Sequence, residues 1–383
     1  MLFTGLNSFG QNVPFDRLNT SKFRQLSHEL PTPNEYRTAS GAPGHSYYQN
    51  QANYEMKISL DEKNHRIKGD EWITYINNSP DHLKYLWVQL DQNIRKPGSM
   101  NDLMSKRSLP NSITPEKVSQ DFVEKFEGGF QISDVKDQSG KKLKYTIVNT
   151  MMRIDLRSVL KSGQTIKFHI GWSYNINDRM KGGGRSGYEY FKNEDNSIYT
   201  IAQFFPRMAV YGDDVGWQHK QFLGQGEFTL PFGNYKVSIN VPEDHIVAAT
   251  GELINGSVVL TSNQRKRLSK ARKNFSDPVM IVTQEEAEKS ERSESKTMYN
   301  GRKTWVFTAK KVRDFAFASS RKFIWDVMAV KIGEKVVTAE SFYPKEGNPL
   351  WEQYSTRVVA HSLESYSKHT IDYPYPRAIS VHT

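Results

Sequence analysis

The feature that most constrains the fold is an alternation of apolar and polar residues, repeated in short runs. Residues 54–60 read YEMKISL, residues 65–78 read HRIKGDEWITYINN and residues 84–90 read KYLWVQL. Successive side chains of a strand point to opposite faces of a sheet, so this period of two is typical of strands with one buried face. Turn formers such as Asn77-Asn78-Ser79-Pro80 end the runs. The pattern predicts half-buried antiparallel strands.

The same pattern recurs along most of the chain. Further strands are expected in GGFQISDVKD, KLKYTIVNT, MMRIDL, QTIKFHIGWSYNI, YEYF, SIYTIAQF, GEFTLPF, YKVSINV, HIVAATGEL, GSVVLTS and KTWVFTAKKVRDFAFASS, in chain order. An excursion at 93–127 contains the helical-looking TPEKVSQDFVEKF, in which Pro115 suits a first helical turn. So many short strands without alternating helices predict a mainly β fold, a sandwich or saddle of antiparallel sheets.

Two later segments depart from the alternation. Residues 262–300 are polar and charged, and they predict a long charged loop that is helical in part at most. Between Pro349 and His369 the apolar residues fall near helical spacing, and YPYPRAISV then predicts a strand. A second domain is therefore expected to begin near residue 323.

The first 44 residues are rich in Pro, Asn, Ser and Gly, which predicts a flexible leader. Their opening MLFTGLNSFGQ has no basic flank, so it is either the remnant of an export signal or an unstructured leader. The expected regions are the leader at 1–44, an all-β domain at 45–322 and an incomplete second domain at 323–383.

Composition excludes several classes of protein. The 383 residues suffice for about two domains, and a mean hydropathy of -0.67 argues for a soluble globular chain. No window approaches the roughly 18 consecutive apolar residues of a transmembrane helix, so no transmembrane segment is expected. The chain has no cysteine, which excludes disulfides, thiolate metal ligands and a cysteine nucleophile.

The net charge of +10 raises the question of an anionic partner. The densest basic cluster is Arg265, Lys266, Arg267, Lys270, Arg272 and Lys273. No aromatic stacking platform or nucleic-acid reader motif accompanies it, so a solvated loop is favoured and no nucleic-acid partner is expected.

The residues supply no complete catalytic motif. A zinc peptidase needs two His four apart on one helix face with a Glu beside the first, and HExxH is absent. His361, Glu364 and His369 imitate it, but the spacing turns His369 off the shared face, so a solvated helix is favoured. The glycine-rich KGGGRSG at 181–187 lacks the order of a phosphate loop.

An acid/base group could be sought in Asp213-Asp214 with His219. Adjacent carboxylates in a strand or turn diverge, however, and turn chemistry explains them better. The other histidines are scattered singly, and no G-x-S-x-G nucleophile elbow occurs. From its residues alone, the chain is an all-β module with a truncated α or α/β piece and no catalytic site.

In three stretches the order of the residues is more specific than their periodicity. They are residues 53–90 with PGSM at 97–100, residues 203–253, which begin QFFPRMAVYGDDVGWQHKQFLGQGEF, and KVRDFAFASSRKFIWD at 311–326. From about Tyr47 to Thr383 the chain resembles zinc metallopeptidases of the membrane alanyl aminopeptidase (aminopeptidase N) family, in the form common among exported bacterial members. The second stretch resembles the family's strands beside the active-site cleft.

The resemblance implies a saddle-like antiparallel β-sheet domain followed by the truncated start of a thermolysin-like α/β catalytic domain. The family's G-x-M-E strand and its HExxH zinc motif would follow Thr383, so this portion is expected to lack the zinc site, to bind no zinc itself and to be inactive alone. In the parent, zinc would activate a water that attacks peptide bonds. Peptide substrates and an exported, periplasmic or cell-envelope location are implied in the same way.

The resemblance also implies one site residue. The family's β domain binds the substrate's α-amino group through a T-Q-x-E or T-Q-x-Q motif, in which Gln203 matches the first polar position. Phe205 stands where the second polar anchor is expected, and this departure affects the expected aminopeptidase specificity. A glutamine on a partly buried strand explains Gln203 equally well.

Two hypotheses of different class follow. In the first, the chain is the amino-terminal part of a zinc-dependent metallo-aminopeptidase and forms the cleft wall and the substrate-amine subsite. In the second, it is a non-catalytic β module that binds peptide or protein through sheet edges or an open cleft. The end of the chain within a strand favours the first, because an uncovered strand edge promotes aggregation.

Overall fold

A computed structural model describes residues 33–104, 112–115, 126–184, 186–224, 230–292 and 301–382. They belong to two compact units. The described residues up to Tyr48 and Gly212–Gly216 form one, and the described residues of Gln49–Tyr211 and of the chain from Trp217 onwards form the other.

The small unit is held together by turns and one ion pair. Asn34 Oδ1 accepts hydrogen bonds from the backbone N–H groups two and three residues further on, at 2.8 and 2.9 Å. The Arg37 guanidinium donates to both carboxylate oxygens of Asp213, at 2.8 and 3.0 Å. Of the leader expected at 1–44, residues 1–32 lie outside the described residues, and the rest forms this cross-linked turn.

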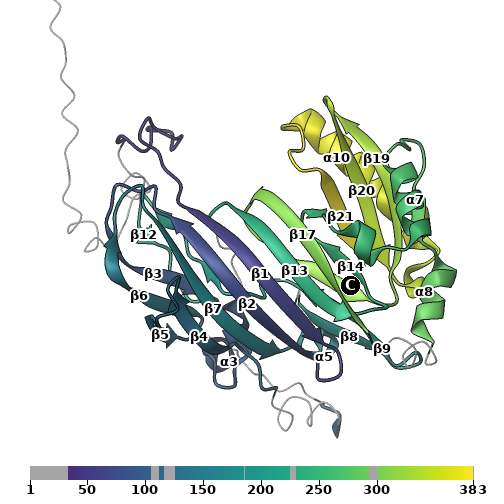
Figure 1. Ribbon diagram of the computed structural model, residues 1–383, viewed down its shortest axis with the longest axis horizontal. Helices are drawn as coiled ribbons and strands as arrows, with labels where there is room; N and C mark the ends of the chain where they lie inside the picture. Colours follow the sequence, from purple (N-terminus) through teal and green to yellow (C-terminus); the bar gives the residue numbers. More distant parts are fainter. Residues whose placement is uncertain are drawn as a thin grey trace, which may run out of the picture. The chain divides into compact units, whose positions relative to one another are not determined.

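The large unit is built on a seven-stranded sheet of order β15-β17-β13-β1-β2-β7-β4 (Figure 1). Its strands, in that order, are Glu252–Leu253, Arg302–Val312, Gly233–Pro242, Gln51–Asp61, Arg66–Ile76, Thr165–Asn175 and Gln131–Asp137. Neighbours are antiparallel except β1 and β13, which are parallel. Every second residue of β1 and β2 is buried, as the alternation predicts.

Two four-stranded sheets and a short hairpin complete the β architecture. One sheet has the order β10-β3-β6-β5, from Arg207–Met208, Leu83–Gln89, Met151–Leu160 and Lys144–Val148. The other has the order β14-β18-β9-β8, from Ile246–Ala249, Phe317–Ser320, Asn196–Ile201 and Gly187–Phe191. The hairpin pairs β11 (Tyr211–Gly212) with β12 (Gly216–Trp217). Apolar residues of the large sheets share one continuous core.

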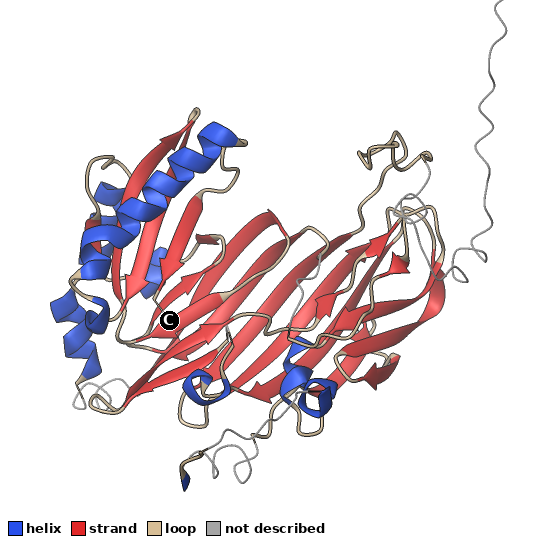
Figure 2. Ribbon diagram, turned by 180° about the vertical axis from the view of Figure 1, so that it is seen from behind, coloured by secondary structure: helices blue, strands red, loops and turns tan. Residues whose placement is uncertain are grey.

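A fourth sheet, β16-β19-β20-β21, carries the longer helices (Figure 2). Its strands are Val279–Val282, Ile324–Ile332, Lys335–Tyr343 and Arg377–Val381, and the helices against it are α7 (Ser262–Ala271), α8 (Gln284–Glu291) and α10 (Thr356–His369). A π-helical turn at Trp351–Ser355 leads into α10, and a 3-10 turn lies at Lys345–Gly347. The helix and strand expected after Pro349 are confirmed.

Two local expectations are wrong. The segment at 262–300, expected as a charged loop that is helical in part at most, also contains a strand, because its described part forms α7, β16 and α8. Both helices begin with a capping box, in which Thr261 pairs with Gln264 and Thr283 with Glu286, so that two exposed N–H groups are satisfied reciprocally at each start.

The run GSVVLTS, expected as a strand, instead forms the short helix α6 (Gly256–Val259). The Asn255 side chain donates to the carbonyl of Thr304 and accepts from the N–H of Val306, so it occupies the edge of β17 to which a strand would bond. The backbone after Asn255 therefore turns away.

Two expected elements fall largely outside the described residues. The helix TPEKVSQDFVEKF includes 116–125 and the strand GEFTLPF includes 226–229, and neither range is described. Around the first excursion, the structure describes the 3-10 turn η1 (Asp91–Arg95) and α3 (Met100–Met104). A short helix α5 (Arg179–Gly182) precedes β8.

The expectation of a mainly β fold with antiparallel sheets is confirmed. Helices of the described segments are either too short or too polar to cross a lipid bilayer.

One ionisable side chain of the large sheet is buried without a polar partner among the described residues. Glu71 of β2 is 0% exposed, and neither carboxylate oxygen has a hydrogen-bond partner among the described residues. Burial in the apolar core raises the pKa of this carboxyl well above its ordinary value, because it disfavours the ionised form. Glu71 is therefore protonated in the folded protein over a wider pH range than in the unfolded chain.

We expect stability to fall with rising pH because of Glu71. Its favourable contribution is complete below the unfolded pKa of about 4.3 and is lost as pH rises towards the raised pKa of the folded state. Glu71→Gln, which cannot ionise, should remove up to about 1.4 kcal/mol per pH unit from this slope. Urea unfolding from pH 5 to 8 measures it, and parallel curves for the two proteins would contradict the assignment.

Candidate functional site

The predicted site residue Gln203 lies two residues beyond the end of β9. It is half-buried, and its backbone carbonyl accepts a hydrogen bond of 2.9 Å from Gln92 Nε2. Gln92 Oε1 in turn accepts a hydrogen bond of 3.0 Å from Arg95. The side-chain amide of Gln203 has no hydrogen-bond partner among the described residues, so it remains available to a ligand.

The backbone of Gln203 is strained. Its φ of 50° lies in the left-handed region, where a residue with a Cβ atom costs about 1–2 kcal/mol relative to the right-handed conformation. Residues held in this way concentrate at binding and catalytic sites. No spacing of residues in the sequence indicates this conformation.

Phe205, at the position of the expected second anchor, is part of the core. It is 0% exposed and packs edge-on against the rings of Tyr54 and Phe204. A buried phenyl ring cannot accept a hydrogen bond from an amine. Gln203 is therefore the one polar side chain of this motif in the structure.

A cleft of about 660 Å³ lies beside the end of β9. Its walls come from Thr200 and Ile201, from the β14–β15 segment at 248–252, from the ends of β17 and β18, and from residues 373–381. Many of the lining side chains are alanine or threonine, which leaves room beside the backbone. Gln203 is two positions after the lining residue Ile201 in the sequence and does not itself line the cleft.

Arg377 fastens one wall of the cleft to the other. Its guanidinium donates to both oxygens of Glu340, each at 2.6 Å, and also to the carbonyl of Gly251. Burial alone would lower the pKa of Arg377, but the nearby carboxylate of Glu340 outweighs it and the pKa is raised. Gly251 has a φ of 84°, and a Cβ there would lie 2.2 Å from the carbonyl oxygen of Thr308, so only glycine fits.

β21 is the last strand of the fourth sheet within the described residues, and it lies beside this cleft. β21 is parallel to β20, and hydrogen bonds join Thr338 N to the Pro376 carbonyl and His382 N to the Phe342 carbonyl. Bonds in a ladder repeat every second residue, so the even-numbered residues face β20 and the odd-numbered ones face outwards. The outward N–H and C=O groups of Ile379 and Val381 have no partner among the described residues.

The other sequence candidates do not form a site. His361, Glu364 and His369 lie on α10 and are exposed. Across the described ranges, no three His, Cys, Asp or Glu side chains come together in a way that could hold a metal ion. The residues present therefore do not fit a zinc ion.

The proposed acid/base residues already have structural partners. Asp213 is bound by Arg37, which holds the pKa of its carboxyl below the ordinary value. His219 Nδ1 lies 2.8 Å from the Trp217 carbonyl, and its ring stacks on Trp87. The glycine-rich segment 181–187 leads from α5 into β8 without a helix after it, as expected.

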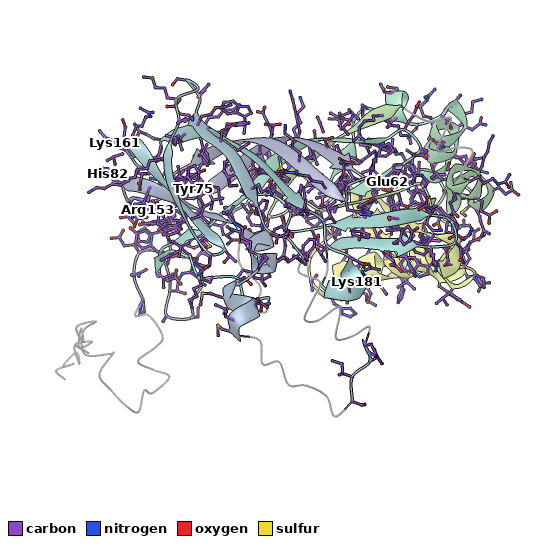
Figure 3. The ribbon with its side chains drawn as sticks, turned by 90° about the horizontal axis from the view of Figure 1, so that it is seen from below. Glu62, Tyr75, His82, Arg153, Lys161 and Lys181 are labelled. Atoms are coloured by element: carbon purple, nitrogen blue, oxygen red, sulfur yellow. The ribbon has the colours of Figure 1, made fainter. Side chains whose placement is uncertain are left out.

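The structure places His245 between a serine and a glutamate, which the sequence did not reveal. Its Nδ1 lies 2.9 Å from Ser319 Oγ, and its Nε2 lies 3.5 Å from Glu62, in the turn at the opposite end of the β1–β2 hairpin from Tyr75 (Figure 3). Ser, His and Glu resemble a hydrolase triad. His245 and Ser319 are both 0% exposed, however, and Glu62 is bound at both oxygens by Arg321. The group is structural, because no substrate can reach the serine.

Comparison with known proteins gives structural neighbours. No protein-family model matches the chain, and no curated protein matches its sequence. An M1 zinc metallopeptidase from Deinococcus radiodurans is similar with a TM-score of 0.48 and 12% identity, over 88% of this chain and 57% of that one. A mutant M1 zinc metallopeptidase from the same organism, bound to a Tyr-Ser-Ala substrate, gives 0.47 and 12%, over 89% and 58%. The chain spans less than two thirds of either.

Removing the Arg377 clamp should destabilise the protein. Arg377→Met leaves Glu340, which is 2% exposed, as an uncompensated buried charge, and we expect a loss of about 3–5 kcal/mol of unfolding free energy. Arg357→Met removes an exposed pair with Asp277 and should cost less than about 1 kcal/mol. Urea unfolding compares the two variants. Equal losses would show that the clamp is no stronger than a surface ion pair.

Proposed function

We propose that this chain is the amino-terminal part of a zinc-dependent metallo-aminopeptidase, which removes residues from the amino termini of peptides. One observation carries the proposal. The sequence of the stretch 203–253 resembles the family's strands beside the active-site cleft. This stretch supplies residues 248–252 of the cleft wall. Sequence resemblance and cleft position therefore fall on the same segment. In this proposal the protein is exported to the periplasm or cell envelope.

The zinc ion of such an enzyme would be held by residues outside this sequence. The described residues do not fit it, and the sequence has no HExxH. The proposed contribution of this chain is to bind and orient a peptide. The walls of the cleft supply backbone and small side chains, and the Arg377 clamp keeps the two walls at a fixed separation.

Gln203 is the proposed contact for the peptide's free amino group. Its amide oxygen can accept a hydrogen bond from an ammonium group, and such charge-assisted bonds contribute about 1.5–3 kcal/mol. Its strained backbone, its unpaired amide and its place just beyond Ile201 all support this role. Without a second polar anchor at Phe205, discrimination between free and blocked amino termini rests on Gln203 alone.

A non-catalytic peptide-binding module is the second candidate function. The cleft favours it, because a hollow lined by backbone and small side chains can hold a peptide without any catalytic group. The two functions share the cleft and differ in chemistry. An assay for zinc-dependent hydrolysis of a bound peptide by the longer protein distinguishes the two functions.

We expect the chain of 383 residues to retain no stoichiometric zinc and to hydrolyse no aminoacyl p-nitroanilide, since its sequence has no HExxH and its described residues contain no ligand set. Elemental analysis after dialysis, with a release assay on the same sample, measures both. His361→Ala serves as the control and should leave the metal content unchanged. One retained equivalent of zinc would overturn the assignment of the metal to another part of the protein.

The amine subsite predicts a preference for free amino termini. A fluorescent peptide with a free amino terminus should bind more tightly than its acetylated form. Gln203→Ala should reduce the ratio of the two dissociation constants about tenfold. Gln353→Ala, which changes an exposed glutamine before α10, is the matched control. Fluorescence anisotropy gives six affinities, those of the two peptides for the unchanged protein and for each of the two variants. If the preference survives in Gln203→Ala, another group binds the amine.

A further inference from the structure

Three consecutive polar side chains are buried in the 3-10 turn η1. Asp91, Gln92 and Asn93 are each 2% exposed. A buried polar side chain is unfavourable unless its hydrogen bonds to water are replaced. Asn93 replaces them with bonds of 2.7 and 2.9 Å to the backbone of two other loops. The other two side chains bind the segment that contains Gln203.

Asp91 and Gln92 hold the two ends of the segment 203–207. Asp91 accepts a hydrogen bond from the guanidinium of Arg207, at the end of the segment. Gln92 Nε2 donates a hydrogen bond of 2.9 Å to the carbonyl of Gln203, at its start. The two phenylalanines between these ends are 0% exposed and pack against each other. Neighbouring residues of one turn therefore determine where both ends of this segment lie.

Side chains bind the backbone where it leaves the sheet at the start of this segment. β9 ends at Ile201, and Gln203 has the left-handed φ of 50°. The Ala202 N–H donates to Ser186 Oγ at 3.2 Å, and the carbonyls of residues 202 and 203 accept from Gln92 Nε2 at 3.4 and 2.9 Å. A strained backbone conformation persists only where the surrounding structure over-determines it. Gln92 supplies the bond to the carbonyl of the strained residue itself.

Arg95 fixes which end of the Gln92 amide faces Gln203. A guanidinium can only donate hydrogen bonds, and Arg95 Nη1 lies 3.0 Å from Gln92 Oε1. The amide oxygen of Gln92 therefore faces Arg95, and the amide nitrogen faces the two carbonyls. Arg95 is half-buried and has no carboxylate partner among the described residues, so its bond to Gln92 is not shared with an ion pair.

We propose that Gln92 is a positioning residue for Gln203 and that it determines the preference of this site for peptides with a free amino terminus. This inference rests on the proposed function of Gln203 and adds the residue that orients it. Gln92 is buried and does not touch the peptide. Its bond holds the Gln203 backbone in the left-handed conformation, and that conformation sets the direction of the side-chain amide. Without the bond, Gln203 relaxes to an unstrained conformation and its amide no longer meets the ammonium group.

The first test uses the full chain and the two fluorescent peptides, one with a free and one with an acetylated amino terminus. Gln92→Met removes the amide and keeps the length of the side chain. We expect it to reduce the ratio of the two dissociation constants about tenfold and to change the affinity for the acetylated peptide by less than about twofold. Gln89→Met is the matched control and should leave the ratio unchanged. Gln89 is 3% exposed, and its side chain meets Arg207 at 3.5 Å and not the carbonyls of residues 202 and 203.

A second test needs no peptide. Gln203→Gly relieves the strain of the left-handed conformation, because glycine adopts a positive φ without a steric penalty. If Gln92 maintains that strain, the gain in the folding equilibrium constant should be at least about threefold larger in the protein with Gln92 than in Gln92→Met. The gain in a Gln89→Met background should equal that in the unchanged protein. Urea unfolding of the single and double variants measures these gains.

Additive effects of Gln203→Gly and Gln92→Met on unfolding would overturn the proposal, whatever the peptides show. So would a ratio that falls in Gln203→Ala and survives in Gln92→Met, or one that falls equally in Gln89→Met. Equal binding of the two peptides by the unchanged protein would contradict the proposed function of Gln203, and with it the specificity role of Gln92. If Gln92→Met fails to fold, Arg95→Met tests the same bond, since it removes the group that orients the amide, and it should reduce the ratio in the same direction.

Discussion

The burial of one face of the seven-stranded sheet is the constraint on which the rest of the structure depends. Alternate residues of β1 and β2 lie in one continuous core with residues of the smaller sheets, as far along the chain as Phe342. Because side chains alternate at a period of two, a shift of one residue in any strand would exchange its buried and polar faces. The register of β14, β15 and β18, and with it the wall of the cleft, follows from this burial.

The charges buried with that core are almost all paired. Arg207, 3% exposed, is bound by Asp91 and by Asp314. Lys322 is 0% exposed, and its ammonium lies 2.9 Å from Glu346 and 4.4 Å from the centre of the Phe191 ring. Such pairs add little net stability compared with apolar residues, but breaking one leaves an uncompensated charge. They determine which segments can lie together. Glu71 differs from them because it has no such partner among the described residues.

The sequence revealed the strands because their pattern is local. It also contained the capping boxes of α7 and α8, T-x-x-Q and T-x-x-E, which the prediction for 262–300 from its charge did not use. The helix after Asn255 was not predictable, because it depends on two bonds to β17 about fifty residues away. The pairing of β1 with β13, the only parallel pair of the large sheet, is likewise set by partners distant in sequence.

The candidate site also has one part that could be predicted from the sequence and another part that depends on the fold. Gln203 was identified from a resemblance, and no local pattern could show its positive φ or its unpaired amide. Arg377 binds Glu340, which is 37 positions away in the sequence, and Gly251, which is 126 positions away. These contacts exist only once β20, β21 and the turn at Gly251 are in place. Binding residues of this kind are supplied by the fold and not by a motif. The cleft is therefore best understood as the place where strands of three sheets, β14, β15 and β21, meet. Its walls come from segments distant in sequence, so its shape depends on the packing of all three sheets and on no local pattern.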